Sequence, residues 1–141
     1  MASDELQTAV AEYETLRAQL EALTQQNELL RMSLEEHMRA KETMKRFQQG
    51  GEGAEILVPI GANSFLFAQI KDPDKAIIGI GSDLTIEEDM DTAVKRLEGQ
   101  ITQIESALNA IAERIVEFSQ KVEEKSGLVR ELYGQAQMAN E

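Results

Sequence analysis

Few side chains in this sequence could do covalent or metal chemistry. The chain has one histidine, His37, and no cysteine, so it offers no thiolate nucleophile and no histidine–cysteine set for zinc. Glu35 and Glu36 precede the histidine directly, but neighbouring carboxylates on an exposed helix are typically solvated. These residues predict no active site, metal site or cofactor, and we expect that the protein is not an enzyme.

Two further patterns could bind a ligand. Gly79-Ile80-Gly81 could begin a dinucleotide-binding motif, but its third glycine would fall on Leu84, where no helix is expected to open. The acidic run Asp72-Pro73-Asp74, with Asp83 further on, could hold a cation weakly, but the spacing does not match a calcium loop. Both patterns are better explained as strands and turns.

The charge balance argues against nucleic acid and membrane partners. The net charge is −12, from 26 acidic and 14 basic residues, and no long segment is basic. Binding to phosphate backbones or anionic lipids requires the opposite sign. No apolar run approaches the roughly 20 residues that span a bilayer. Met1-Ala2-Ser3-Asp4-Glu5 has neither the basic nor the apolar region of a signal peptide, so we expect none. With no cysteine to oxidise, we expect a cytoplasmic protein.

The strongest pattern is a pair of apolar series whose members are alternately three and four residues apart. The first series is Leu6, Ala9, Tyr13, Leu16, Leu20, Leu23, Asn27, Leu30, Leu34, His37, Lys41 and Met44. The second is Met90, Val94, Leu97, Ile101, Ile104, Leu108, Ile111, Ile115, Phe118, Val122, Lys125, Val129 and Leu132. Such spacing places each series on one stripe of a helix, and the stripe must be buried against another.

The two stripes have similar lengths, so the chain is expected to fold back on itself as an antiparallel coiled coil. The expected segments are a helix over 3–49, an insert over 54–88 and a helix over 89–136. Paired residue numbers should then sum to 138, which places Leu20 against Phe118. The same alignment places Tyr13 against Lys125, although a slip of one heptad would preserve the pattern.

The insert is expected to form two β-hairpins. Two apolar runs surround the tetrad Gly61-Ala62-Asn63-Ser64, and two more surround Gly81-Ser82-Asp83. The strands read as apolar on both faces and leave open edges, which about 35 residues cannot cover alone. We expect an oligomeric β body whose contacts come from Ile56, Val58, Ile60, Phe65, Phe67, Ile70, Ile77, Ile78, Ile80, Leu84 and Ile86.

Between the two expected helices, the hairpin region contains Val58-Pro59-Ile60-Gly61, Phe67-Ala68, Asp72-Pro73-Asp74-Lys75 and Gly79-Ile80-Gly81, with Ile70 and Glu87. These motifs, on two long helices that flank two hairpins, resemble the α class of the prefoldin family. It implies a hexamer of two α and four β subunits, whose coiled coils project from a β body. It further implies that the assembly captures unfolded proteins and delivers them to a group II chaperonin without nucleotide hydrolysis.

The resemblance also gives a meaning to apolar residues near both termini, which the alignment brings together at the end of the coil. The expected client-binding residues are Leu6, Val10, Tyr13, Leu128, Val129, Leu132, Tyr133 and Met138. Without the resemblance, these would be ordinary exposed residues at fraying helix ends. The alternative function is a structural coiled-coil scaffold or tether that its β insert multimerises.

Overall fold

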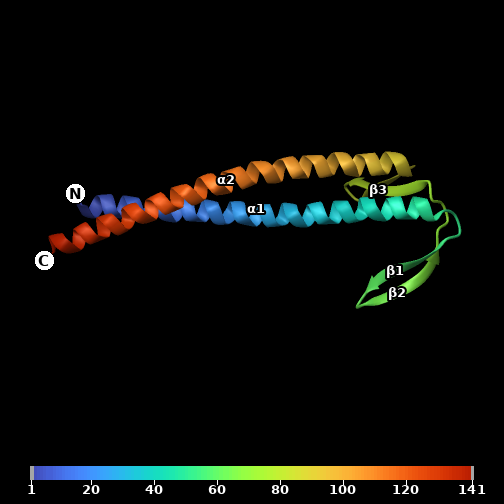
Figure 1. The fold of residues 1–141 in the computed structure, drawn as a ribbon, viewed down its shortest axis with the longest axis horizontal. Coiled ribbons are helices and arrows are strands. Elements are labelled where there is room, and N and C mark those ends of the chain that lie inside the picture. The colour runs from blue at the N-terminus through green and yellow to red at the C-terminus, as the bar shows by residue number, and fades with distance from the viewer. Residues whose placement is uncertain (1, 141) are drawn as a thin grey trace. The chain divides into compact units, whose positions relative to one another are not determined.

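A computed structural model describes residues 2–140, which form two long helices with two β-hairpins between them in the sequence (Figure 1). Helix α1 spans Ala2–Gly50 and helix α2 spans Met90–Ala139. Between them lie the strands β1 (Glu55–Gly61), β2 (Ser64–Gln69), β3 (Lys75–Gly81) and β4 (Leu84–Asp89). The expected fold class, mostly helical with two inserted hairpins, is confirmed.

Both heptad stripes are protected from solvent. Each of the stripe residues named above is buried or half-buried, whereas most residues between them along the helices are exposed. Ala9, Leu23, Val94 and Ile101 are among the most deeply buried side chains. The spacing of apolar residues therefore identifies the packed face of both helices.

The chain divides into two compact units. The first, here the terminal unit, contains the residues up to Met32 and those from Glu105 onward; the second, here the hairpin unit, spans Ser33–Ile104. In the terminal unit, the Lys125 ammonium donates a hydrogen bond to the Glu12 carboxylate. This pair joins the start of α1 to the end of α2, so the helices are antiparallel there.

The hairpin unit joins the end of α1 to the start of α2. The Lys41 ammonium lies 3.5 Å from the Glu98 carboxylate, and the Gln48 amide donates a 3.0 Å hydrogen bond to Asp91. The paired residue numbers sum to 139 in both cases, and to 137 for Glu12 with Lys125. These sums lie next to 138, whereas a slip of one heptad would shift them by seven.

A disulfide test can check this alignment in the terminal unit. Cysteines at Leu20 and Phe118 should oxidise to a disulfide in high yield, because residues of one layer approach within disulfide reach. The control pairs Leu20→Cys with Ile111→Cys, which lies one heptad, about 10 Å, before Phe118 in α2. Gel mobility without reductant measures the yield. Preferential oxidation of the control pair would reject the alignment.

Each hairpin closes with two residues in the left-handed conformation. These are Ala62 and Asn63 in the first hairpin, and Ser82 and Asp83 in the second, with φ between 51° and 60°. Two consecutive positive φ values define the tight turn whose twist matches that of the paired strands. Gly61 and Gly81, at φ 96° and 99°, accompany a shift in the strand register just before each turn.

Substitution of Gly81 tests how much the positive φ at this position contributes to stability. A Cβ at this position would meet no atom within 4 Å, so Gly81→Ala costs stability only through the positive φ, by about 1–2 kcal/mol. Amide exchange in β3 and β4 should accelerate about 5–30-fold. Gly79→Ala is the matched control, because that glycine lies two residues earlier in open space without a positive φ. Equal acceleration by both variants would contradict this explanation.

The first hairpin is apolar on both faces, as expected. Leu57 lies opposite Phe67 on one face, and Val58 lies opposite Leu66 on the other. Because β1 and β2 form a sheet of only two strands, its backbone edges carry no further strand from residues 2–140. This hairpin therefore exposes apolar faces and unpaired edges together.

The second hairpin differs from the expectation. Ile77 lies opposite Glu87 on one face, where Thr85 is the next residue of β4. Ile78 lies opposite Ile86 on the other face. The expectation of two apolar faces is therefore wrong for β3 and β4, because the alternation of Thr85 and Glu87 with Ile86 makes one face largely polar.

Ion pairs join the two strands of the second hairpin to each other and join β4 to α2. Glu88 is only 9% exposed, and both of its carboxylate oxygens accept hydrogen bonds of 3.0 Å from the Arg96 guanidinium. These hydrogen bonds and the charge of Glu88 raise the pKa of Arg96. Lys75 donates a 2.9 Å hydrogen bond to Asp89, which raises the pKa of Lys75 in the same way. The bidentate pair fixes the end of β4 on the first turns of α2.

Candidate functional site

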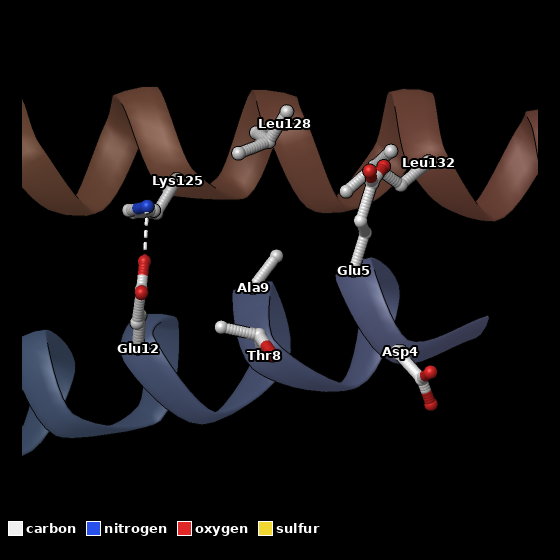
Figure 2. A pocket seen from close by; sticks show the side chains of 8 residues that line it. All are labelled: Asp4, Glu5, Thr8, Ala9, Glu12, Lys125, Leu128 and Leu132. Atoms are coloured by element: carbon white, nitrogen blue, oxygen red, sulfur yellow. Dashed lines mark hydrogen bonds and ion pairs between the residues drawn. The ribbon is translucent and has the colours of Figure 1, made fainter. Parts of the chain in front are cut away.

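The terminal unit contains an open groove of about 410 Å³ between the start of α1 and the end of α2 (Figure 2). Its lining residues are Asp4, Glu5, Thr8, Ala9, Glu12, Lys125, Leu128 and Leu132. Ala9, Leu128 and Leu132 form the apolar part of this lining, and the remaining side chains are polar. The groove can therefore accept an apolar side chain between polar margins.

The carboxylates at the groove differ in direction. In Figure 2 the Glu5 side chain reaches toward Leu132 of the facing helix, whereas the Asp4 carboxylate turns away from that helix. Glu12 reaches the Lys125 ammonium and forms an ion pair with it. Glu5 is thus an acidic group beside the apolar wall, and the lysine at the groove already has an acidic partner.

Lys125 also lines two neighbouring hollows of the terminal unit. One, of about 390 Å³, is lined by Ala11, Glu12, Thr15, Leu16 and Lys125. The other, of about 280 Å³, is lined by Leu16, Lys121, Glu124, Lys125 and Leu128. A lysine occupies a stripe position here, and its ammonium extends to Glu12 instead of filling the space between the helices. The hollows coincide with this interruption of the apolar stripe.

The groove brings together only part of the set expected from the sequence. Leu128 and Leu132 line it, while Tyr133 and Met138 are 56% and 78% exposed outside it. The Tyr133 hydroxyl accepts a 3.0 Å hydrogen bond from the Gln137 amide. The remaining members, which do not line the groove, are half-buried: Leu6, Val10, Tyr13 and Val129.

Sequence reasoning missed the residues that give the groove its shape and charge. Ala9 is the smallest residue of the first stripe, and Lys125 is the single polar residue of the second. The expected alignment places Ala9 and Lys125 in adjacent layers of the coiled coil. A small side chain therefore lies next to a position where the apolar series is interrupted by a lysine. These two neighbouring positions are the sequence signal that could have predicted a groove. Glu5 and Glu12 lie near Ala9 on α1, so the same signal would have placed them at the groove.

The hairpins present a second apolar surface. Among the residues expected to make contacts there, Phe67 and Ile77 are 78% and 73% exposed. The other exposed members are Val58, Ile60, Phe65, Ile80, Leu84 and Ile86, and Leu57 and Leu66 join them. Ile56 and Ile78 are half-buried.

Ile70 does not belong to this surface. It is 3% exposed, and its side chain lies 3.3 Å from where a Cβ of Gly50 would stand. Its backbone amide donates to the Ala54 carbonyl, and its own carbonyl accepts from Gly53. Ile70 therefore closes the junction between α1 and the first hairpin, and its expected contact with another subunit is corrected here.

Within residues 2–140, no helix is long and apolar enough to cross a membrane. The same part of the chain contains no group of three or more acidic or histidine side chains that could hold a metal ion. The Nδ1 atom of His37 lies 2.7 Å from the backbone carbonyl of Ser33, one turn earlier in α1. The single histidine thus makes a local helix contact.

Comparison with known proteins adds to these observations. A family model described as "Prefoldin subunit" matches residues 4–135. The chain is 31% identical to prefoldin subunit alpha of Pyrococcus horikoshii over 96% of its length and 93% of the relative's length. It is 36% identical to prefoldin subunit alpha of Thermococcus onnurineus over 72% of this chain and 69% of that one.

Two solved structures are similar to the fold. One is a cryo-EM structure of filamentous prefoldin from Methanocaldococcus jannaschii, with 25% identity, a TM-score of 0.52 and coverage of 86% of this chain and 95% of that one. The other is the prefoldin beta subunit from Thermococcus strain KS-1, with 18% identity, a TM-score of 0.59 and 90% coverage of both chains. The second likeness concerns the fold alone. The family match over nearly the whole length, on a chain of two long helices and two hairpins, means that this protein belongs to the prefoldin family.

Proposed function

We propose that this chain is a subunit of a molecular chaperone that holds unfolded polypeptides and delivers them to a group II chaperonin. The holding step uses apolar contact with the groove of the terminal unit and needs no nucleotide. The proposed location is the cytoplasm. The observation that carries this proposal is the open apolar groove at the helix termini, in a chain of the prefoldin family.

The proposed client is an unfolded protein because the site is shallow, apolar and open. A groove whose apolar wall consists of Ala9, Leu128 and Leu132 can accept many apolar side chains, and its polar residues lie at open margins that do not enclose a small molecule. Tyr133 and Met138 add exposed apolar area nearby in the sequence, and methionine adapts to varied partners. Contacts of this kind are individually weak, so several subunits must act on one client.

The hairpins supply the proposed means of bringing subunits together. Phe67, Leu57 and Ile77 are exposed on sheets of two strands, which are rarely stable without further covering. We propose that β-type subunits cover them in a hexamer of two α and four β chains. Each copy of this chain would then contribute one groove to the assembly.

The experiment is an aggregation assay with the assembled complex. A complex whose α subunits lack residues 1–12 and 127–141 should suppress aggregation of a denatured client less than the complete complex, because seven of the eight residues that line the groove lie in those segments. Native mass spectrometry must show that both complexes have the same subunit composition. Equal suppression by both complexes would refute client binding at the groove, and the hairpins would then support a scaffold role.

A further inference from the structure

The geometry points to a charge preference in the groove: we propose that it takes apolar segments of unfolded polypeptides that carry a lysine or arginine beside the apolar residues. The proposal rests on the proposed holding function and specifies the substrate class of the same site. It concerns the groove lined by Ala9, Leu128 and Leu132 together with the acidic side chain of Glu5.

The surroundings of the groove are strongly acidic. Residues 3–16 contain four carboxylates and no base, and residues 122–140 contain three carboxylates and two bases. One of those two bases, Lys125, is paired with Glu12. A bound segment therefore meets a negative field, which favours cationic side chains and disfavours acidic ones.

The positions of Glu5 and of the apolar wall match a client segment that carries both apolar and cationic side chains. Glu5 reaches toward Leu132, so a carboxylate lies at the margin of the apolar wall (Figure 2). A lysine or arginine side chain has an apolar stem and a charged end, and can lie along such a wall while its charge reaches the margin. An acidic segment with the same apolar residues would bring like charges together. The groove thus distinguishes between clients of equal hydrophobicity.

The test uses three disordered peptides that share one apolar core containing a benzophenone amino acid, and that are flanked by lysine, serine or glutamate. Each peptide is irradiated with the assembled complex, and mass spectrometry measures the adducts on the terminal unit of this chain. The lysine-flanked peptide should give about three- to tenfold more adduct than the glutamate-flanked one at low salt. The difference should largely disappear at 0.5 M salt, where the screening length is about 4 Å.

Two variants locate the effect. Glu5→Gln should lower the preference for the lysine-flanked peptide about two- to fivefold. Asp4→Asn is the matched control, because Asp4 lies in the same first turn and complements the helix dipole equally, but its carboxylate turns away from the facing helix. Asp4→Asn should therefore lower the preference less. Circular dichroism verifies that both variants keep their helix content.

The outcomes separate this proposal from the holding function. Equal adduct yields from all three peptides on the terminal unit would overturn the charge preference and leave client holding intact. An unchanged preference for the lysine-flanked peptide in Glu5→Gln would also overturn the proposal, because residues other than Glu5 would then cause the preference. Absence of adducts from every peptide, together with no suppression of aggregation, would refute the holding function itself.

Discussion

Replacing Leu57 and Phe67 together with serine will prevent the chain from joining its partner subunits. The two residues face each other across β1 and β2 and are 58% and 78% exposed in the single chain. Covering each side chain in an interface contributes about 1.5–3 kcal/mol, so the double variant should weaken association by roughly 10²- to 10⁴-fold. Native mass spectrometry with β-type subunits measures the loss of the complex.

The control for this variant replaces Leu29 and Met32 with serine. These residues are 66% and 58% exposed and lie three apart on α1, so they remove a similar apolar area outside the hairpins. Assembly should survive in the control. If the complex dissociates in the Leu29 and Met32 variant but persists in the Leu57 and Phe67 variant, the hairpins are not the assembly surface.

The helices were predictable because their pattern is long and redundant. Each stripe repeats over many turns, so weak members such as Asn27 or His37 do not obscure it, and both are half-buried where the pattern places them. The alignment followed from matching the two stripes. The antiparallel ion pair between Glu12 and Lys125 agrees with it.

The positions of the hairpins were predictable, but the distribution of apolar residues over their faces was only partly predictable. Turn residues and apolar runs located all four strands. The strand that reads Leu-Thr-Ile-Glu begins with an apolar residue and is expected to be apolar on both faces, but its alternation places Thr85 and Glu87 on one face. Ile70 was misassigned for a related reason, because hydrophobicity does not distinguish a junction within the chain from an interface between chains.

The apolar members of the stripes do not by themselves indicate the groove, which lies where Ala9 and Lys125 interrupt the series of large apolar residues. A stripe predicts which residues pack, but it does not predict where packing leaves space. That depends on side-chain size and on where the Lys125 ammonium goes, namely to Glu12. Lys125 is the single polar member of the second stripe, and all three hollows include it in their lining.

Replacing Lys125 with leucine should make the terminal unit more stable and less able to hold clients. Leucine completes the apolar stripe and loses an ion pair that is partly exposed, so the net gain in unfolding free energy should be about 1–2 kcal/mol. Its side chain would fill space that Lys125 leaves open beside Ala9 and Leu128. Thermal denaturation and the aggregation assay measure the two effects.

Lys41→Leu is the matched control, because Lys41 is also a stripe lysine. The side chains of Lys41 and Lys125 are both 31% exposed, and each pairs with a glutamate, Glu98 or Glu12. Both variants should raise stability, but only Lys125→Leu should require more complex to suppress aggregation, since Lys41 lines no part of the groove. If both variants hold clients equally well, the space beside Lys125 is not where clients bind. If Lys125→Leu alone gains stability and loses client holding, then Lys125 keeps the groove open although the helices pack less well there.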